Sequence, residues 1–239
     1  MKVLATSDLH GNLNDLNFES ADIVLIAGDF MEQKGFGKWR MQDQKKWLYE
    51  KFFPLVEKHA KVHFVAVPGN HDLCLDWRLT SKFKDMNWNI KWPKNFHLLV
   101  DEMIELNGLK IYGTPWVPVI SMIWAYEAEH DALVKKFRKI PANLDILLTH
   151  TPPRIPDSCI DRSMQWGGYE AFGSSELAQV IFEKRPKNLF CGHIHSGTHD
   201  EVEFEGCKCY NVSRVDENYE IAYEPKVVEI FPSVKMDEV

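Results

Sequence analysis

Five short clusters that contain aspartate, asparagine or histidine recur along the chain, and most of them include glycine. They are Asp8-Leu9-His10-Gly11-Asn12, Gly28-Asp29, Gly69-Asn70-His71-Asp72, Thr149-His150 and Gly192-His193-Ile194-His195. Carboxylate and amide oxygens combined with imidazole nitrogens suit manganese, iron or zinc better than calcium, which prefers oxygen ligands alone. A glycine beside a ligand lets the backbone turn sharply, so that the next side chain faces a shared site. The residue types therefore indicate metal-assisted chemistry.

Each cluster is weak evidence when it is taken alone. An isolated aspartate or asparagine beside glycine is commonly a turn or helix-capping residue, and an isolated histidine is commonly a buried residue whose hydrogen bonds are satisfied. The context of the clusters favours the metal interpretation, because each one follows directly on a predicted strand. Turn chemistry alone does not explain five such coincidences in one chain.

Short aliphatic runs lead into all five clusters. We predict strands over residues 2–6, 23–27, 62–67, 146–148 and 189–191, and their continuous apolar character is typical of strands buried on both faces. Apolar stripes predict helices over residues 44–59, 122–139 and 176–183, the last with Ser174 or Ser175 as N-cap. Residues 201–210 and 226–230 predict strands without intervening helices, which favours an antiparallel portion. These elements predict a layered α/β fold whose polar residues gather at strand ends.

In this order the clusters resemble the motifs of the calcineurin-like metallophosphoesterases, and the likeness spans residues 3–195. Three further stretches, residues 113–116, 148–153 and 191–197, are similar to a narrower branch of that superfamily, the small metallophosphoesterase-domain (MPPED-like) proteins. The resemblance implies a four-layer α-β-β-α sandwich, in which two mixed sheets are flanked by helices. It also implies that the tail strands complete the second sheet.

The resemblance assigns a role to each motif residue. It implies two metal ions, the first held by Asp8, His10 and His195. The second would be held by Asn70, His150 and His193, and Asp29 would bridge both. Manganese is the expected metal, with iron, zinc or nickel as alternatives. His71 is expected over the phosphate, where it stabilises charge or protonates the leaving oxygen with support from Asp72, so that His71 and Asp29 are the expected catalytic residues.

The function implied is a binuclear phosphodiesterase that hydrolyses a small or nucleotide-like phosphate ester by attack of a metal-bridging hydroxide. The alternatives are a metal-dependent nuclease and a metal-binding interaction scaffold with little activity. Asn12 is a candidate contact for a substrate oxygen. Trp116 and Trp166, both in loops rich in glycine and proline, are candidates for an aromatic wall of the substrate pocket. For both tryptophans, packing in the core stays an equal alternative.

Bulk properties narrow the function classes. The 239 residues contain no Gly/Ser-rich or Pro-rich linker, which predicts a single domain over residues 1–239. A formal net charge of −7 disfavours nucleic acid as a partner, because backbone neutralisation needs a basic face. The longest apolar stretch is too short to span a bilayer, and the first residues do not resemble a secretory signal. The chain has five cysteines, and this odd number indicates reduced thiols. We expect a cytoplasmic protein without a membrane partner, and the oligomeric state stays open.

Overall fold

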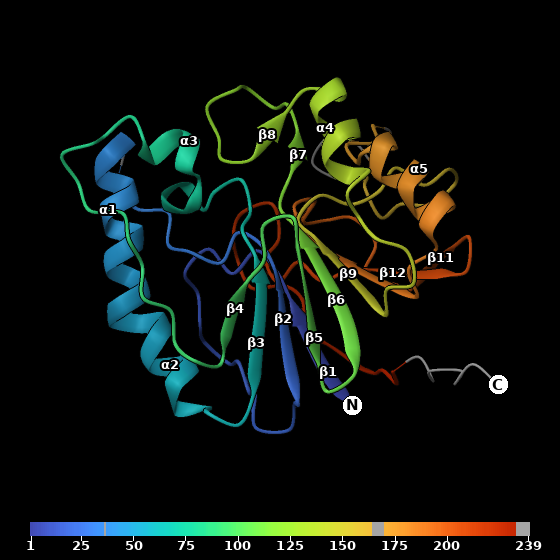
Figure 1. Ribbon diagram of the computed structural model, residues 1–239, viewed down its shortest axis with the longest axis horizontal. Helices are drawn as coiled ribbons and strands as arrows, with labels where there is room; N and C mark the ends of the chain where they lie inside the picture. Colours follow the sequence, from blue (N-terminus) through green and yellow to red (C-terminus); the bar gives the residue numbers. More distant parts are fainter. Residues whose placement is uncertain (36, 164–169, 233–239) are drawn as a thin grey trace.

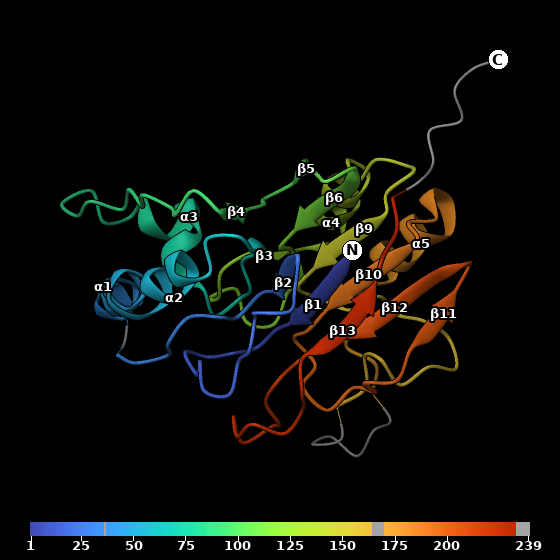
Figure 2. The same cartoon turned by 90° about the horizontal axis from the view of Figure 1, so that it is seen from below.

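Two mixed β-sheets lie face to face at the centre of the computed structural model, which describes residues 1–35, 37–163 and 170–232 (Figures 1 and 2). The first sheet has the order β13-β1-β2-β3-β4. Its strands are β1 (Lys2–Thr6), β2 (Ile23–Ala27), β3 (His63–Val67), β4 (Phe96–Leu98) and β13 (Lys226–Glu229). Strand β13 pairs antiparallel with β1, and the other neighbours pair in parallel.

The second sheet has the order β11-β12-β10-β9-β6-β5. Its strands are β5 (Glu102–Leu106), β6 (Leu109–Thr114), β9 (Ile146–Thr149), β10 (Asn188–Cys191), β11 (Val202–Phe204) and β12 (Cys207–Asn211). The four inner strands are parallel, and the edge strands β5 and β11 are antiparallel to their neighbours. A separate pair, β7 (Val117–Pro118) and β8 (Glu127–Ala128), lies above this sheet in Figure 1.

Helices cover the outer face of each sheet. The first sheet is covered by α1 (Gly37–Trp47), a π-helical turn η1 (Leu48–Phe52) and α2 (Phe53–Lys58). A 3-10 turn η2 (Leu73–Leu75) and α3 (Trp77–Thr80) lie near α1 (Figure 1). The second sheet is covered by α4 (His130–Phe137) and α5 (Ser175–Lys184), which pack against each other. The arrangement confirms the predicted α-β-β-α sandwich.

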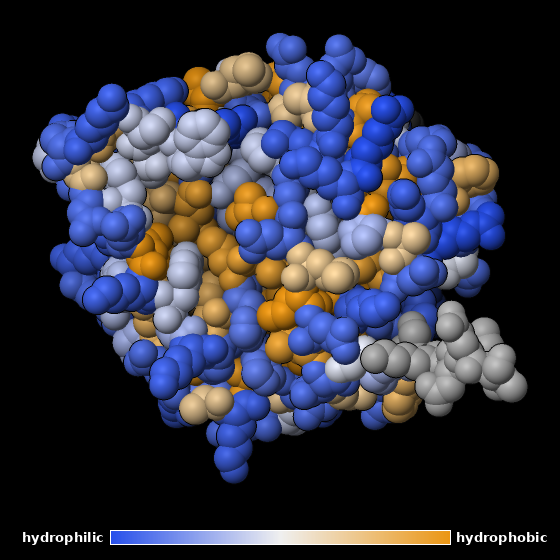
Figure 3. Space-filling view, in the orientation of Figure 1, coloured by the Kyte–Doolittle hydropathy of each residue, from blue (hydrophilic) through white to orange (hydrophobic). Residues whose placement is uncertain are grey.

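The alternation of side chains along the strands builds two apolar layers. Val3 and Ala5 of β1 point into the core between the sheets, whereas Leu4 points to the helices, because successive side chains of a strand face opposite ways. This is why the strands read as continuous apolar runs. On the face drawn in Figure 3, hydrophilic residues dominate the rim and hydrophobic residues gather toward the middle.

Three predictions of secondary structure need correction. The predicted helix over residues 122–139 is α4 alone, which begins at His130, because Met122 and Tyr126 have the left-handed φ values 62° and 54°. The predicted helix over residues 44–59 begins earlier, at Gly37. The tail is antiparallel only in part, since β12 pairs in parallel with β10, and only β11 and β12 complete the second sheet, because β13 joins the first sheet beside β1. Trp166 lies outside the described residues. Within the described ranges, no helix combines the length and apolar character needed to cross a membrane.

Candidate metal centre

The side chains predicted as metal ligands come together at one end of the two sheets. Asp8, Asp29 and Asn70 follow β1, β2 and β3 of the first sheet, while His150 and His193 follow β9 and β10 of the second. Within each sheet the carboxyl ends of parallel strands lie at the same edge, which gathers the residues that follow them. The facing of the two sheets then brings both sets into one site.

One group of possible ligands consists of Asp8, His10 and His195. One ligand atom from each lies within 4.8 Å of the others. The Nε2 atoms of His10 and His195 are 3.4 Å apart, and the His195 Nε2 is 3.5 Å from Asp8 Oδ1. Two imidazole nitrogens and a carboxylate oxygen facing one another form a donor set suited to a transition metal.

A second group is centred on Asp29 and His150. The His150 Nε2 lies 3.3 Å from Asp29 Oδ2 and 2.9 Å from Asn70 Oδ1. The ring of His193 is adjacent, with its centroid 4.9 Å from that of His150. Ligand atoms of Asp8, Asp29 and His150 also lie within 4.8 Å of one another, so Asp8 belongs to both groups. The structure thus brings together all seven predicted ligands, while their division between two ions and the bridging role of Asp29 stay predictions.

Hydrogen bonds hold the two carboxylates in place. Asp8 Oδ2 accepts from the Ser213 hydroxyl at 2.7 Å and from the backbone N–H of His193 at 3.0 Å. Asp29 Oδ1 accepts from the backbone N–H of His71 at 2.7 Å. Each of these bonds occupies one oxygen of a carboxylate, and the other oxygen faces the imidazole rings.

Backbone carbonyls set the orientation of two histidines. The Nδ1 of His150 donates to the carbonyl of Ala27 at 2.8 Å, and that of His195 donates to the carbonyl of Asp216 at 2.9 Å. In the neutral ring, a proton fixed on Nδ1 leaves the lone pair on Nε2, which is the atom that points to the ligand groups. These contacts are the kind that orients histidine in metal sites.

The backbone around the ligands takes up strained conformations. Asp8, His10, Asp29 and His193 have left-handed φ values of 52°, 44°, 50° and 71°. Such values are disfavoured for residues with a Cβ and cluster at functional sites, at a cost of about 1–3 kcal/mol each. Packing of the surrounding sheets holds these turns in place. The ligand side chains therefore face the site, while the local backbone is less stable than a relaxed turn.

Neighbouring glycines are packed directly against ligand atoms. A methyl group on Gly69 would lie 2.1 Å from Asp29 Oδ1, and one on Gly192 would lie 2.3 Å from Asp8 Oδ2. Both distances are far below ordinary contact. The glycines therefore have a steric role in the site, beyond the flexible turn expected from the sequence.

Burial keeps two of the imidazole rings neutral. It lowers the pKa of His10 to about 4 and the pKa of His193 to about 3. A neutral imidazole offers a free lone pair on one nitrogen, which metal binding requires.

The other two histidines face carboxylates, and the charges reverse the effect of burial. Burial acts to lower the pKa of His150, but the charge of Asp29 and its hydrogen bond outweigh it and raise the pKa to about 9. Asp8 does the same for His195, whose pKa also rises to about 9. In return, although burial favours the neutral acids, the imidazoles hold the pKa values of Asp8 and Asp29 well below the usual range. Two buried carboxylates among imidazoles therefore attract positive charge, and the donor set fits metal ions.

His71 lies at the edge of the ligand groups. Its ring centroid is 5.2 Å from that of His10 and 4.4 Å from that of Trp124. Asp72, expected to support the His71 ring, is fully buried and instead accepts from the backbone N–H groups of Met31 at 3.0 Å and Gly69 at 2.8 Å. It therefore fixes the loops that carry the ligands, and burial together with the charge of Asp29 raises its pKa to about 7.

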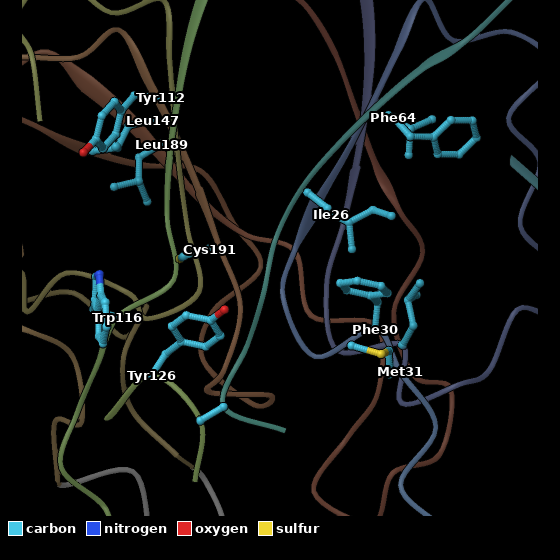
Figure 4. Close-up of a cluster of buried hydrophobic side chains, with 14 of the residues drawn as sticks. Ile26, Phe30, Met31, Phe64, Tyr112, Trp116, Tyr126, Leu147, Leu189 and Cys191 are labelled. Carbon is cyan, nitrogen blue, oxygen red and sulfur yellow. The ribbon is translucent and has the colours of Figure 1, made fainter. Parts of the chain in front are cut away.

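The two predicted substrate contacts differ in outcome. Trp116 is 5% exposed, donates from Nε1 to Asp101 at 3.0 Å and packs beside Tyr126 in the apolar cluster of Figure 4. The prediction that it forms a pocket wall is therefore corrected in favour of core packing. The side-chain oxygen of Asn12 accepts from the backbone N–H of Asn14 at 3.1 Å, a local turn contact, and its substrate role stays a prediction.

Several side chains around the site were missed by sequence reasoning. The Tyr219 ring lies 4.8 Å from that of His10 and 5.4 Å from that of His195. Gln33 Nε2 contacts His10 Nδ1, and Arg40 Nη2 lies 3.3 Å from His71 Nδ1. None of these residues belongs to a motif, so only the folded chain reveals them.

An open cavity of about 580 Å³ adjoins the ligand groups at His193. Ile120 and Phe172 give it apolar walls, and Arg154 and Glu217 add charge. Its size suits a small organic molecule.

Known proteins share both sequence and fold with this chain. The family model described as calcineurin-like phosphoesterase matches residues 1–197. A UPF0046 protein of Caenorhabditis elegans is 36% identical over 256 residues, which cover 92% of this chain and 58% of that protein, so the chain spans less than two thirds of that relative. Metallophosphoesterase domain-containing protein 1 of Homo sapiens is 27% identical over 248 residues, covering 96% of this chain and 71% of that protein. The structure of TT1561 of Thermus thermophilus superposes with a TM-score of 0.59 at 14% identity, covering 95% of this chain and 97% of that one.

Proposed function

The chain belongs to the calcineurin-like phosphoesterase family, and on that premise we propose that it is a phosphodiesterase with two metal ions. The family implies metal-dependent hydrolysis of phosphate esters. The similarity to metallophosphoesterase domain-containing protein 1 confirms the narrower resemblance drawn from the motifs. The observation that carries the proposal is the pair of ligand groups joined by Asp8.

We assign the ligands as the motifs suggest. Asp8, His10 and His195 would hold one ion, and Asn70, His150 and His193 would hold the other. Asp29 would be a ligand shared by both ions. When bound, two such cations supply the Lewis acidity that makes water nucleophilic at neutral pH and neutralise charge on the phosphate oxygens. Manganese is our first choice, and iron, zinc and nickel are alternatives with the same ligand preferences.

The side chains of the protein position the substrate and the proton. The His71 Nδ1 faces a donor, Arg40 Nη2, at 3.3 Å, so the proton of the neutral ring resides on Nε2. An N–H at Nε2 can donate to an ester oxygen and stabilise the charge that develops there. Trp124, packed against the His71 ring, limits its rotation.

We propose a small or nucleotide-like ester as substrate. The cavity beside His193 is large enough for such a group, and the net charge of −7 disfavours a polyanionic polymer. We also propose a cytoplasmic location, because four of the five cysteines are buried as free thiols.

The test is metal-dependent hydrolysis by the purified protein. After removal of metal with EDTA and reloading with Mn²⁺, the protein should hydrolyse bis(p-nitrophenyl) phosphate faster than p-nitrophenyl phosphate. Absence of turnover with Mn²⁺, Fe²⁺, Zn²⁺ and Ni²⁺ would favour the interaction scaffold. Salt-sensitive cleavage of single-stranded DNA in place of small diesters would favour the nuclease.

Variants separate the roles of the residues. Asp29→Asn should lower metal content and abolish turnover, whereas His71→Ala should keep its metal and lose about 100-fold or more in kcat, as for a removed transition-state donor. Asp43→Asn, an exposed aspartate on α1, is the matched control and should behave as the wild type. An Asp29→Asn variant with full metal content and a normal rate would refute the assignment.

A further inference from the structure

Arg40 of α1 reaches into the candidate metal centre from outside the motifs. Its guanidinium Nη2 lies 3.3 Å from His71 Nδ1, and its Cζ lies 5.5 Å from the centroid of the Trp124 ring. The Trp124 ring in turn contacts that of His71, with the centroids 4.4 Å apart and the planes tilted by 48°. The three side chains come from three separate segments and form one cluster beside the ligand groups.

The hydrogen bonding of Arg40 is incomplete in the folded chain. Its Nε is shielded from solvent and has no hydrogen-bond partner among the described residues. The guanidinium groups of Arg78 and Arg185 are paired with the carboxylates of Asp76 at 2.5 Å and Glu205 at 3.2 Å, whereas Arg214, like Arg40, has buried guanidinium nitrogens without a partner among the described residues. A buried donor without an acceptor is costly.

The position of Arg40 in its helix does not explain its presence. It lies in the first turn of α1, which begins at Gly37. A cation there is disfavoured by the helix dipole, which has its positive end at the N-terminus. Burial lowers the pKa of Arg40, and the negative charge of Asp29 opposes that effect in part.

Arginine is suited to phosphate, because its planar fork of N–H groups matches two oxygens at once. The side chain of Arg40 is half-buried, so a small anion can reach its guanidinium. Beside its contact with His71 Nδ1, the guanidinium of Arg40 has further N–H groups that an anion next to His71 can bind. We propose that Arg40 is a substrate-binding residue that holds a phosphate oxygen next to His71. That this phosphate oxygen belongs to an ester substrate rests on the proposed function.

The decisive measurement is binding of inorganic phosphate to the Mn²⁺-loaded protein by isothermal titration calorimetry. Arg40→Met should weaken the Kd for inorganic phosphate at least 10-fold with unchanged metal content. Arg40→Lys keeps a point charge without the fork, and its Kd for inorganic phosphate should lie between those of the wild type and Arg40→Met. Lys38→Met removes the same charge from the same helical turn and is the matched control, with an expected change under twofold.

Kinetics with bis(p-nitrophenyl) phosphate give an independent readout. The KM of Arg40→Met should rise in step with the Kd for phosphate. If Arg40→Met binds phosphate within twofold of the wild type, or if it loses metal, the assignment of Arg40 is refuted. If the wild type binds phosphate in an Arg40-dependent manner but hydrolyses no ester, the assignment of Arg40 stands and the proposed phosphodiesterase function fails.

Discussion

Replacing Gly28 with alanine should disable the site through one collision. Gly28 follows β2 with a φ of 96°, and a methyl group there would lie 2.4 Å from His150 Nδ1. Ordinary contact needs about 3.5 Å, so the imidazole must move by about 1 Å. That nitrogen is also bonded to the carbonyl of Ala27 at 2.8 Å, so the ring cannot move without breaking this bond.

The size of the effect follows from the displacement. A shift of about 1 Å in a reacting constellation lowers the rate about 100-fold, which corresponds to about 2.7 kcal/mol of lost transition-state stabilisation. We therefore expect kcat/KM of Gly28→Ala for bis(p-nitrophenyl) phosphate to fall about 100-fold, together with the affinity for Mn²⁺.

Backbone strain needs a control, because alanine at a positive φ is strained wherever it lies. Gly206 has a φ of 79°, and a methyl group there would meet no atom within 4 Å. Gly206→Ala should thus lose about 1 kcal/mol of stability and keep its activity. Both variants are compared by urea unfolding and by kcat/KM. A folded Gly28→Ala that retains at least a third of the wild-type kcat/KM would show that His150 is not held as described.

Two further predictions concern stability. Glu127→Gln should lower the free energy of unfolding in urea by about 1–3 kcal/mol and reduce turnover. The carboxylate accepts from the backbone N–H groups of Ile120 at 2.6 Å and Trp124 at 2.8 Å, and an amide loses one of these acceptors. An unchanged unfolding midpoint would contradict this prediction. Ser174→Ala should cost about 1 kcal/mol with normal turnover, since the hydroxyl caps α5 by accepting from the N–H of Leu177 at 3.1 Å; thermal unfolding indistinguishable from the wild type would count against the cap.

The buried strands were predictable because their apolar runs follow from burial on both faces. Strands β1 and β2 have the predicted bounds, and α5 has Ser174 as its N-cap. Strand β5 was not predicted, because it is an edge strand with Glu102 and Met103 exposed, and its alternation carries little signal. The helix expected from Met122 does not form because the carboxylate of Glu127 gathers the backbone N–H groups of Ile120, Ser121 and Trp124 into a loop, in which Met122 and Tyr126 are left-handed.

The candidate ligands were also predictable, because each follows a strand and the sheet geometry brings strand ends together. The residues around them were not. Ser213, Arg40, Trp124 and Tyr219 reach the site from segments whose local sequence carries no motif. Their proximity depends on how loops pack over the sheets, which no spacing along the chain encodes.

The left-handed turns at four candidate ligands predict which substitutions would accumulate in a related protein that no longer needs the site. These ligands are Asp8, His10, Asp29 and His193. At these positions the demands of the backbone and of the chemistry are opposed, since glycine would relax the turn and only the present side chain supplies a donor atom. A descendant released from catalysis should therefore gain stability by accepting glycine at these four positions. Such replacements would mark the loss of enzymatic function in a gene that still encodes a sound fold.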